Sequence, residues 1–258
     1  MVTNIEISGY TEEVLEALVK AGIYGSKTEA IRDAVRRLIE SYDLKDVSLR
    51  AYKGGGISFQ LAVEISSLSV DELLWYFLSR DMTPMLGSDD ETEVKTSEEQ
   101  LKERGSLVFD LSSLYTTLEL DISDVVSRLG KRLSISSKTM ERAKALTLRL
   151  SKMRGVVYSF SGFEVVNVNK SLAEFSRKNG ISLQEAHSMY IAKKLGALLI
   201  SDDLRTRQVS RTHGVAAAPT LSLILYARDA GIVSDAKLKE LVTKMATIPY
   251  VVPKAMLI

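Results

Sequence analysis

The chain has 258 residues and contains no cysteine, only two histidines, one tryptophan and four prolines. Without cysteine there is no disulfide, no thiolate metal ligand and no cysteine nucleophile. With His187 and His213 alone, a histidine-rich metal site or a Ser-His-Asp triad is not expected. Any metal must then be held by oxygen ligands, which favours Mg²⁺ or Mn²⁺ as the cofactor.

Long apolar runs are also missing. A membrane span needs roughly 20 consecutive apolar residues, and no uncharged run of that length occurs. The first residues do not resemble a signal peptide. We therefore expect a cytoplasmic protein without a membrane partner. Its length favours two domains, and its 45% hydrophobic and 26% charged residues are typical of a protein that buries real cores.

The net charge of +1 conceals an uneven distribution. Residues 1–105 carry 20 acidic and 12 basic side chains, a net charge of −8, whereas residues 106–258 carry 13 and 22, a net charge of +9. The basic portion suits a polyanionic substrate, and the acidic portion suits a segment that covers or neutralises it. The alternative is chance unevenness in two solvated surfaces.

The N-terminal segment predicts a strand, a helix, a turn and a second helix. Residues 3–8 alternate as a short strand does, and residues 11–21 follow as a helix. Ser26-Lys27-Thr28-Glu29 has the pattern of a capping box and opens the second helix. So short a unit cannot bury its own apolar face, so we expect a homodimer formed through residues 1–45.

The stretch GIYGSKTEAIRDAVRRLIES in this segment resembles the ribbon-helix-helix antitoxins and repressors. The resemblance implies strands that pair across a dimer and enter the major groove of operator DNA. The residues expected to face DNA are Asn4, Glu6, Ser8, Ser26 and Lys27. Residues 1–46 carry nine acids against six bases, so a pure dimerisation module is the alternative.

Residues 47–85 predict two short helices, the second led by a capping box at Ser69–Glu72. They resemble a helix-turn-helix segment of antitoxins encoded beside PIN toxins. The alternative is a packing unit whose Trp75 and Phe77 lie against another domain. Residues 86–105 are acidic and polar, and we interpret them as a linker. Its acids Asp89, Asp90, Glu91 and Glu93 are expected to lie over a basic groove in the C-terminal portion.

Two buried strands of the C-terminal portion end in acids. Residues 106–109 lead into Asp110, and residues 197–200 lead into Asp202 and Asp203. Because ligands gather outside the carboxyl ends of parallel strands, these acids are expected to share one site. Helices between the strands add Glu141 and Glu185. Such a cluster suits a metal-dependent phosphodiesterase.

Three stretches of this portion, LVFDLSS, SISSKTMERAK and SLQEAHSMYIAKKLGALLISDDLRTRQVSRTHGV, resemble the PIN family, in particular its VapC-like ribonuclease toxins. The resemblance implies an α/β/α domain with a central parallel sheet that cleaves single-stranded RNA. It implies catalytic and metal-binding roles for Asp110, Glu141, Glu185 and Asp203, with Asp202 as a further metal ligand. It also implies RNA contacts from Ser112, Arg205, Arg207 and Arg211.

We therefore predict an α/β protein with four parts. These are a ribbon-helix-helix module (1–46), an antitoxin-like helical segment (47–85), an acidic linker (86–105) and a PIN-like nuclease domain (106–258). The predicted function is a metal-dependent endoribonuclease fused to its antitoxin-like regulator. The alternative is a DNA-binding regulator or complex-forming protein that keeps an inactive PIN scaffold.

Overall fold

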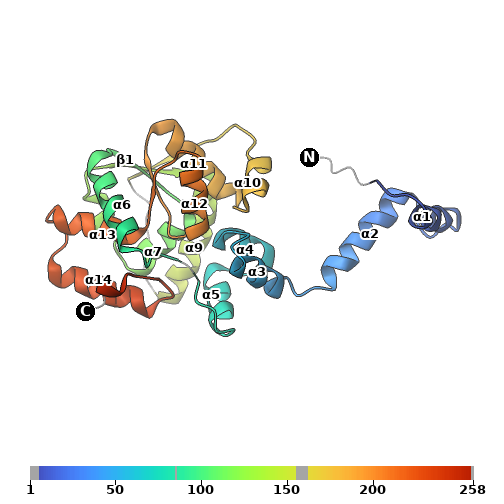
Figure 1. The fold of residues 1–258 in the computed structure, drawn as a ribbon, viewed down its shortest axis with the longest axis horizontal. Coiled ribbons are helices and arrows are strands. Elements are labelled where there is room, and N and C mark those ends of the chain that lie inside the picture. Colours follow the sequence, from blue (N-terminus) through green and yellow to red (C-terminus); the bar gives the residue numbers. More distant parts are fainter. Residues whose placement is uncertain (1–5, 85, 155–161, 257–258) are drawn as a thin grey trace. The chain divides into compact units, whose positions relative to one another are not determined.

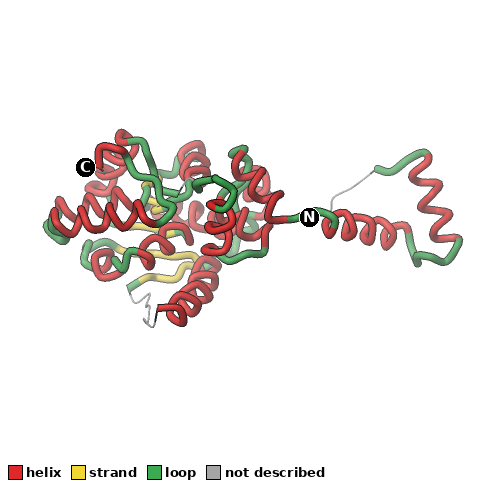
Figure 2. Tube along the Cα trace, turned by 90° about the horizontal axis from the view of Figure 1, so that it is seen from below, coloured by secondary structure: helices red, strands yellow, loops and turns green. Residues whose placement is uncertain are grey.

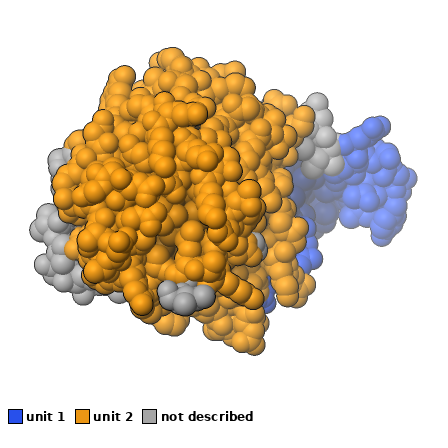
Figure 3. All heavy atoms as spheres, turned by 60° about the vertical axis from the view of Figure 1, so that its left-hand side comes forward, with its two compact units in different colours: residues 1–47 blue, residues 48–258 orange. Residues whose placement is uncertain are grey.

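The computed structural model describes residues 6–84, 86–154 and 162–256, with side chains of the long helix α9 described as far as residue 146. The chain divides into two compact units, residues 1–47 and 48–258, which Figure 3 distinguishes by colour. In the described residues, no helix has the length and apolar character required to cross a lipid bilayer.

The first unit contains α1 (Tyr10–Lys20), α2 (Lys27–Glu40) and the beginning of α3 (Leu44–Lys53). Both helices predicted there are present, and the Ser26 hydroxyl caps α2 by accepting a hydrogen bond from the Glu29 backbone N–H. The predicted strand lies partly outside the described residues, and its described part, residues 6–8, has no strand structure.

The second unit is built on a five-stranded parallel sheet with strand order β3-β2-β1-β4-β5 (Figure 1). Its strands are β1 (Ser106–Phe109), β2 (Arg132–Ser136), β3 (Phe163–Val166), β4 (Leu198–Ile200) and β5 (Ala217–Ala218). Its further helices are α4 (Phe59–Ser66), α5 (Val70–Leu78), α6 (Glu91–Glu103), α7 (Leu111–Glu119), α8 (Ser123–Ser127), α9 (Ser137–Arg154), α10 (Ala173–Asn179), α11 (Leu183–Leu195), α12 (Leu204–Thr212), α13 (Thr220–Asp229) and α14 (Asp235–Thr247), and a 3-10 turn η1 spans Lys254–Met256.

Alternate residues of the central strands point into two hydrophobic cores, one on each face of the sheet. Leu107 and Phe109 of β1 belong to the larger core, which includes α6, α7, α13 and α14. Val108 of the same strand belongs to the smaller core with α10, α11 and α12. The strands therefore lie between two helical layers (Figure 2), as the α/β/α prediction requires.

The segment predicted as an acidic linker is folded into the second unit. Helix α6 buries Val94 and Leu101 completely and packs against α13. Glu91, Glu99 and Glu103 occupy the outer face of an amphipathic helix, whereas Glu93 is turned inward with a side chain that is 7% exposed. The few apolar residues of the helix are spaced to meet the core. The linker interpretation was wrong because those few residues are enough to anchor the helix.

Helices α4 and α5 also belong to the second unit. Both predicted helix starts are confirmed, since Ser58 caps α4 and Ser69–Glu72 forms a capping box on α5. Phe77 is fully buried, as a packing unit requires, but Trp75 is 72% exposed. The expected packing of Trp75 is therefore wrong, and the Phe77 ring contacts Tyr52 and Phe59 within the same segment.

Candidate active site

Asp110 and Asp203 stand at the carboxyl ends of the neighbouring strands β1 and β4, where the sequence predicted them. Each begins a helix. Asp110 caps α7 by accepting the Ser113 N–H at 2.9 Å, and Asp203 caps α12 by accepting the Thr206 N–H at 2.7 Å. Strand order places the two helix starts side by side, so both carboxylates lie at one edge of the sheet.

Asp110 is 1% exposed, and its two oxygens differ. Oδ1 accepts hydrogen bonds from the Ser112 hydroxyl at 2.7 Å and from Ser113. Oδ2 has no hydrogen bond of good geometry and faces the buried Ser201 hydroxyl, which lacks one as well. Burial raises the pKa of Asp110 to about 6. A carboxylate this buried with one unused oxygen is suited to a cation.

Glu185 joins these two acids from the first turn of α11. It forms a capping box with Ser182, and its Oε1 accepts the Thr206 hydroxyl at 2.8 Å. Burial, together with the negative charges of Asp203 and Asp110, raises its pKa. Burial also raises the pKa of Asp203. The three carboxylates are therefore close enough to repel one another.

Asp202 is turned away from this cluster. Its carboxylate accepts hydrogen bonds from the Thr220 N–H and hydroxyl, both at 2.7 Å, and from the Tyr250 hydroxyl at 2.8 Å. These contacts tie the end of β4 to the start of α13 and to the C-terminal segment. Asp202 has this structural role, and the adjacent Asp203 faces Glu185.

Glu141 lies in α9 with an exposed side chain. It is not among the charges that raise the pKa of Glu185 or Asp110. Within the part of the chain that the structure describes, no three acidic or histidine side chains form a ready metal cluster. Hydrogen bonds nevertheless connect three of the acids. Thr206 donates to both Glu185 and Asp203, and Ser112 joins the Asp110 carboxylate to the Asp203 backbone N–H. Glu141 is exposed on α9, apart from these contacts.

The residues expected to contact RNA are placed differently from one another. The Ser112 hydroxyl is buried between Asp110 and the backbone N–H groups of Asp202 and Asp203, so it supports the site. Arg205 is half-buried and donates to the Asn179 carbonyl. The Arg211 side chain is 44% exposed.

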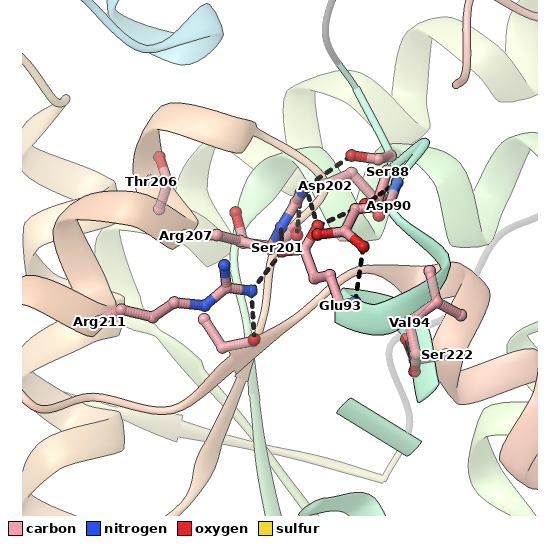
Figure 4. A network of polar contacts seen from close by, with 12 residues as sticks. Ser88, Asp90, Glu93, Val94, Ser201, Asp202, Thr206, Arg207, Arg211 and Ser222 are labelled. Atoms are coloured by element: carbon pink, nitrogen blue, oxygen red, sulfur yellow. Dashed lines mark hydrogen bonds and ion pairs between the residues drawn. The ribbon is translucent and has the colours of Figure 1, made fainter. Parts of the chain in front are cut away.

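Arg207 is fully buried, which corrects the expectation that it contacts RNA. Its guanidinium donates to the carbonyls of Ser201 and Gly87 and pairs with Glu93 at 2.8 Å (Figure 4). Arg211 pairs with the same carboxylate. Glu93 thus covers two of the three arginines, as expected of the acidic segment, but from a packed helix instead of a mobile linker.

Sequence reasoning missed one group of contacts at this site. The Ser58 hydroxyl, at the start of α4, donates to Glu185 Oε2 at 2.6 Å, and the Phe59 N–H donates to Asp203 Oδ2 at 2.9 Å. Ser58 also caps α4, by accepting a hydrogen bond from the Leu61 N–H at 3.1 Å. Nothing local indicated its partner, because Ser58 and Glu185 are 127 positions apart.

The residues expected to face DNA lie in the first unit. Asn4 lies outside the described residues, and Glu6, Ser8 and Ser26 are exposed. Lys27 forms ion pairs with Glu12 at 3.1 Å and Glu16 at 2.8 Å. Its positive charge is therefore already balanced within the unit.

Residues 108–212 match the model of a family described as a PIN domain associated with the TPR-GreAB-C-PIN system. The matched range runs from β1 to the end of α12 and contains Asp110, Glu141, Glu185 and Asp203. The chain has no significant match among curated proteins or among solved structures. The family match and the observed parallel sheet support the same assignment. The C-terminal half of the chain holds a PIN domain, and a helical N-terminal region precedes it.

Proposed function

We propose that the PIN domain is an endoribonuclease that uses Mg²⁺ or Mn²⁺ held by Asp110, Glu185 and Asp203. The observation that carries the proposal is a set of three buried carboxylates: Asp110 and Asp203 follow β1 and β4, and Glu185 of α11 is joined to Asp203 through Thr206. One oxygen of Asp110 has no hydrogen-bond partner. The donor set fits a hard divalent cation in kind, because every candidate ligand is an oxygen.

A divalent cation at such a site would activate a water molecule and stabilise negative charge on the phosphoryl group. The protein's own side chains prepare the carboxylates for it. Ser112 and Ser113 hold Asp110 by Oδ1 and leave Oδ2 available. Thr206 holds Glu185 through its hydroxyl and Asp203 through its N–H. Glu141 stays a candidate fourth ligand, and the proposal does not depend on it.

An RNA strand has a plausible path beside these acids. A cleft of about 740 Å³ is lined by Leu111 and Gln184, the chain neighbours of Asp110 and Glu185. Lys138 and Arg142 of α9 line the same cleft with exposed side chains that suit phosphate groups. The net charge of +9 over residues 106–258 favours the same class of ligand.

The test is cleavage of labelled single-stranded RNA by the full chain with Mn²⁺. Asp110→Asn should lower the rate at least about a hundredfold, because it removes a charged ligand from the cation. Asp121→Asn is the matched control, since Asp121 is exposed and adopts a φ of 55° that asparagine tolerates. Equal activity of Asp110→Asn and the parent chain, or cleavage that persists with chelator, would reject the proposal.

We further propose that residues 1–45 form a homodimerisation module whose partner is a second copy of the chain. The support is a set of exposed apolar side chains in this segment, four of which are spaced along one face of α2 and its end; the set is Tyr10, Ile23, Val35, Leu38, Ile39 and Tyr42. Binding of operator DNA is the alternative role of this module, within a toxin–antitoxin function of the whole chain. The ion pairs of Lys27 with Glu12 and Glu16 favour dimerisation over DNA binding.

A further inference from the structure

The first turn of α4 lies directly on the carboxylate site. Ser58 is fully buried, and its hydroxyl and the Phe59 N–H each donate to one of the clustered acids, Glu185 and Asp203. The Ser58 N–H also donates to the Gly180 carbonyl at 2.7 Å, just before the capping box of α11. Three hydrogen bonds therefore join the start of α4 to two other segments, residues 180–185 and Asp203, that are far from it in the sequence.

The fit between these segments depends on a glycine. Gly180 ends α10 with a φ of +64°, and a Cβ placed there would collide with the Gly56 carbonyl oxygen in the turn that leads into α4. Backbone meets backbone at this point, so only glycine admits the contact. The position of α4 is thus set by close backbone-to-backbone packing as well as by the Ser58 side chain.

The chemistry of the contact resembles that of a bound cation. Buried carboxylates repel each other unless positive charge or hydrogen-bond donors compensate them. The beginning of a helix supplies both, through free backbone N–H groups and the positive end of the helix dipole. Here those donors use oxygens of Glu185 and Asp203 that a metal ion would need.

We propose that the first turn of α4 is an internal plug that competes with a divalent cation for Glu185 and Asp203. The inference rests on the proposed function, since it describes how that site is regulated. An aromatic cluster anchors the plug: Tyr52 of α3 and Phe77 of α5 both contact the Phe59 ring. Loading of the site with metal therefore requires the first turn of α4 to withdraw from the acids.

The direct test measures Mn²⁺ binding by titration calorimetry on the full chain. Ser58→Ala and Ser58→Gly both remove the hydroxyl, and glycine also preserves most of the helix cap. Each should bind Mn²⁺ about tenfold more tightly. Loss of a hydrogen bond to a charged group raises, by about that factor, the fraction of molecules in which the first turn of α4 has left the acids. Ser69→Ala is the matched control: Ser69 caps the next helix, α5, and its hydroxyl bonds only within its own capping box.

A second pair of variants leaves Ser58 intact. Gly180→Ala should push the plug away and tighten Mn²⁺ binding in the same way. Gly196→Ala carries the same backbone strain, at a φ of +61° at the end of α11, but has open space around its Cβ. Hydrogen exchange of the α4 amides should quicken in Gly180→Ala and not in Gly196→Ala.

The outcomes separate this inference from the proposed function. If the parent chain binds Mn²⁺ and neither Ser58 variant binds it more tightly, the plug is rejected while the metal site stands. If no variant binds Mn²⁺, both the metal site and the plug are rejected. Tighter binding in the Ser58 and Gly180 variants, with both controls unchanged, supports the plug.

Discussion

The two units of the chain bury their apolar residues to very different extents. In α2 of the first unit, Ala30 is the one buried residue of fourteen, and α1 has none. In the second unit, all nine residues of α7 are buried. The second unit closes its cores with its own helices on both faces of the sheet, whereas α1 and α2 leave apolar side chains uncovered. Secondary structure alone therefore does not make a stable unit, and the first one needs a further surface to pack against.

The strongest test of this comparison is removal of residues 1–47. The full chain should be a dimer and the remaining chain a folded monomer, because the exposed apolar side chains are lost while both cores of the second unit stay complete. Light scattering gives the mass, and circular dichroism reports the fold.

A cut at residue 105 provides the contrast. It removes α6 together with the buried Val94 and Leu101, so that fragment should fold poorly.

The first truncation also has an outcome that would contradict the comparison. A chain that stays dimeric after loss of residues 1–47 would place the dimer contact in the second unit.

The next test concerns the polar part of the second unit's interior. Glu93→Gln leaves the buried Arg207 without its charged partner and should lower the free energy of unfolding by about 3 kcal/mol. Glu91→Gln, on the same helix, breaks an exposed pair with Lys95 and should cost less than about 0.5 kcal/mol. Denaturant titration measures both, and equal values would show that the Glu93 pair contributes no more than a surface pair.

The last test concerns a difference in acid sensitivity between the two units. Burial alone would raise the pKa of Glu93. The hydrogen bond from Arg207 and the positive charge of Arg207 outweigh that effect and lower the pKa to about 2. A lowered pKa gives stability that is present above the ordinary glutamate range near 4.5 and is lost as the pH falls toward 2. The loss for the second unit should reach at most about 3 kcal/mol over this range.

The first unit has its own carboxylate with a pKa of about 2, Asp33, held low by Arg36 and Tyr24. The Asp33 side chain is 15% exposed, but its partners Arg36 and Arg37 are 67% and 71% exposed, so salt should screen its contribution. The free energy of unfolding should be measured between pH 5 and 2, with and without 0.5 M salt, a concentration at which screening acts over roughly 4 Å. The loss of stability in the second unit should be resistant to salt. A salt-sensitive loss in both units would contradict the difference in burial.

The sequence by itself determined the local features of this protein. The apolar runs before Asp110 and before Asp202-Asp203 predicted two strands that end in acids, and both strands are present. The capping patterns at Ser26 and Ser69 marked helix starts correctly, because their hydrogen bonds join residues three positions apart. The resemblance to the PIN family implied the parallel α/β sheet, which is also present.

Tertiary structure alone decided which of these residues meet. Glu141 and Glu185 both occur early in a helix, yet only Glu185 joins Asp110 and Asp203, because position along a helix does not determine the direction in which the helix lies. Arg207 is spaced like a surface arginine and is buried by Glu93, 114 positions away. The contact of Ser58 with Glu185 has the same origin, since such long-range pairs are selected by packing and leave no periodic signal in the sequence.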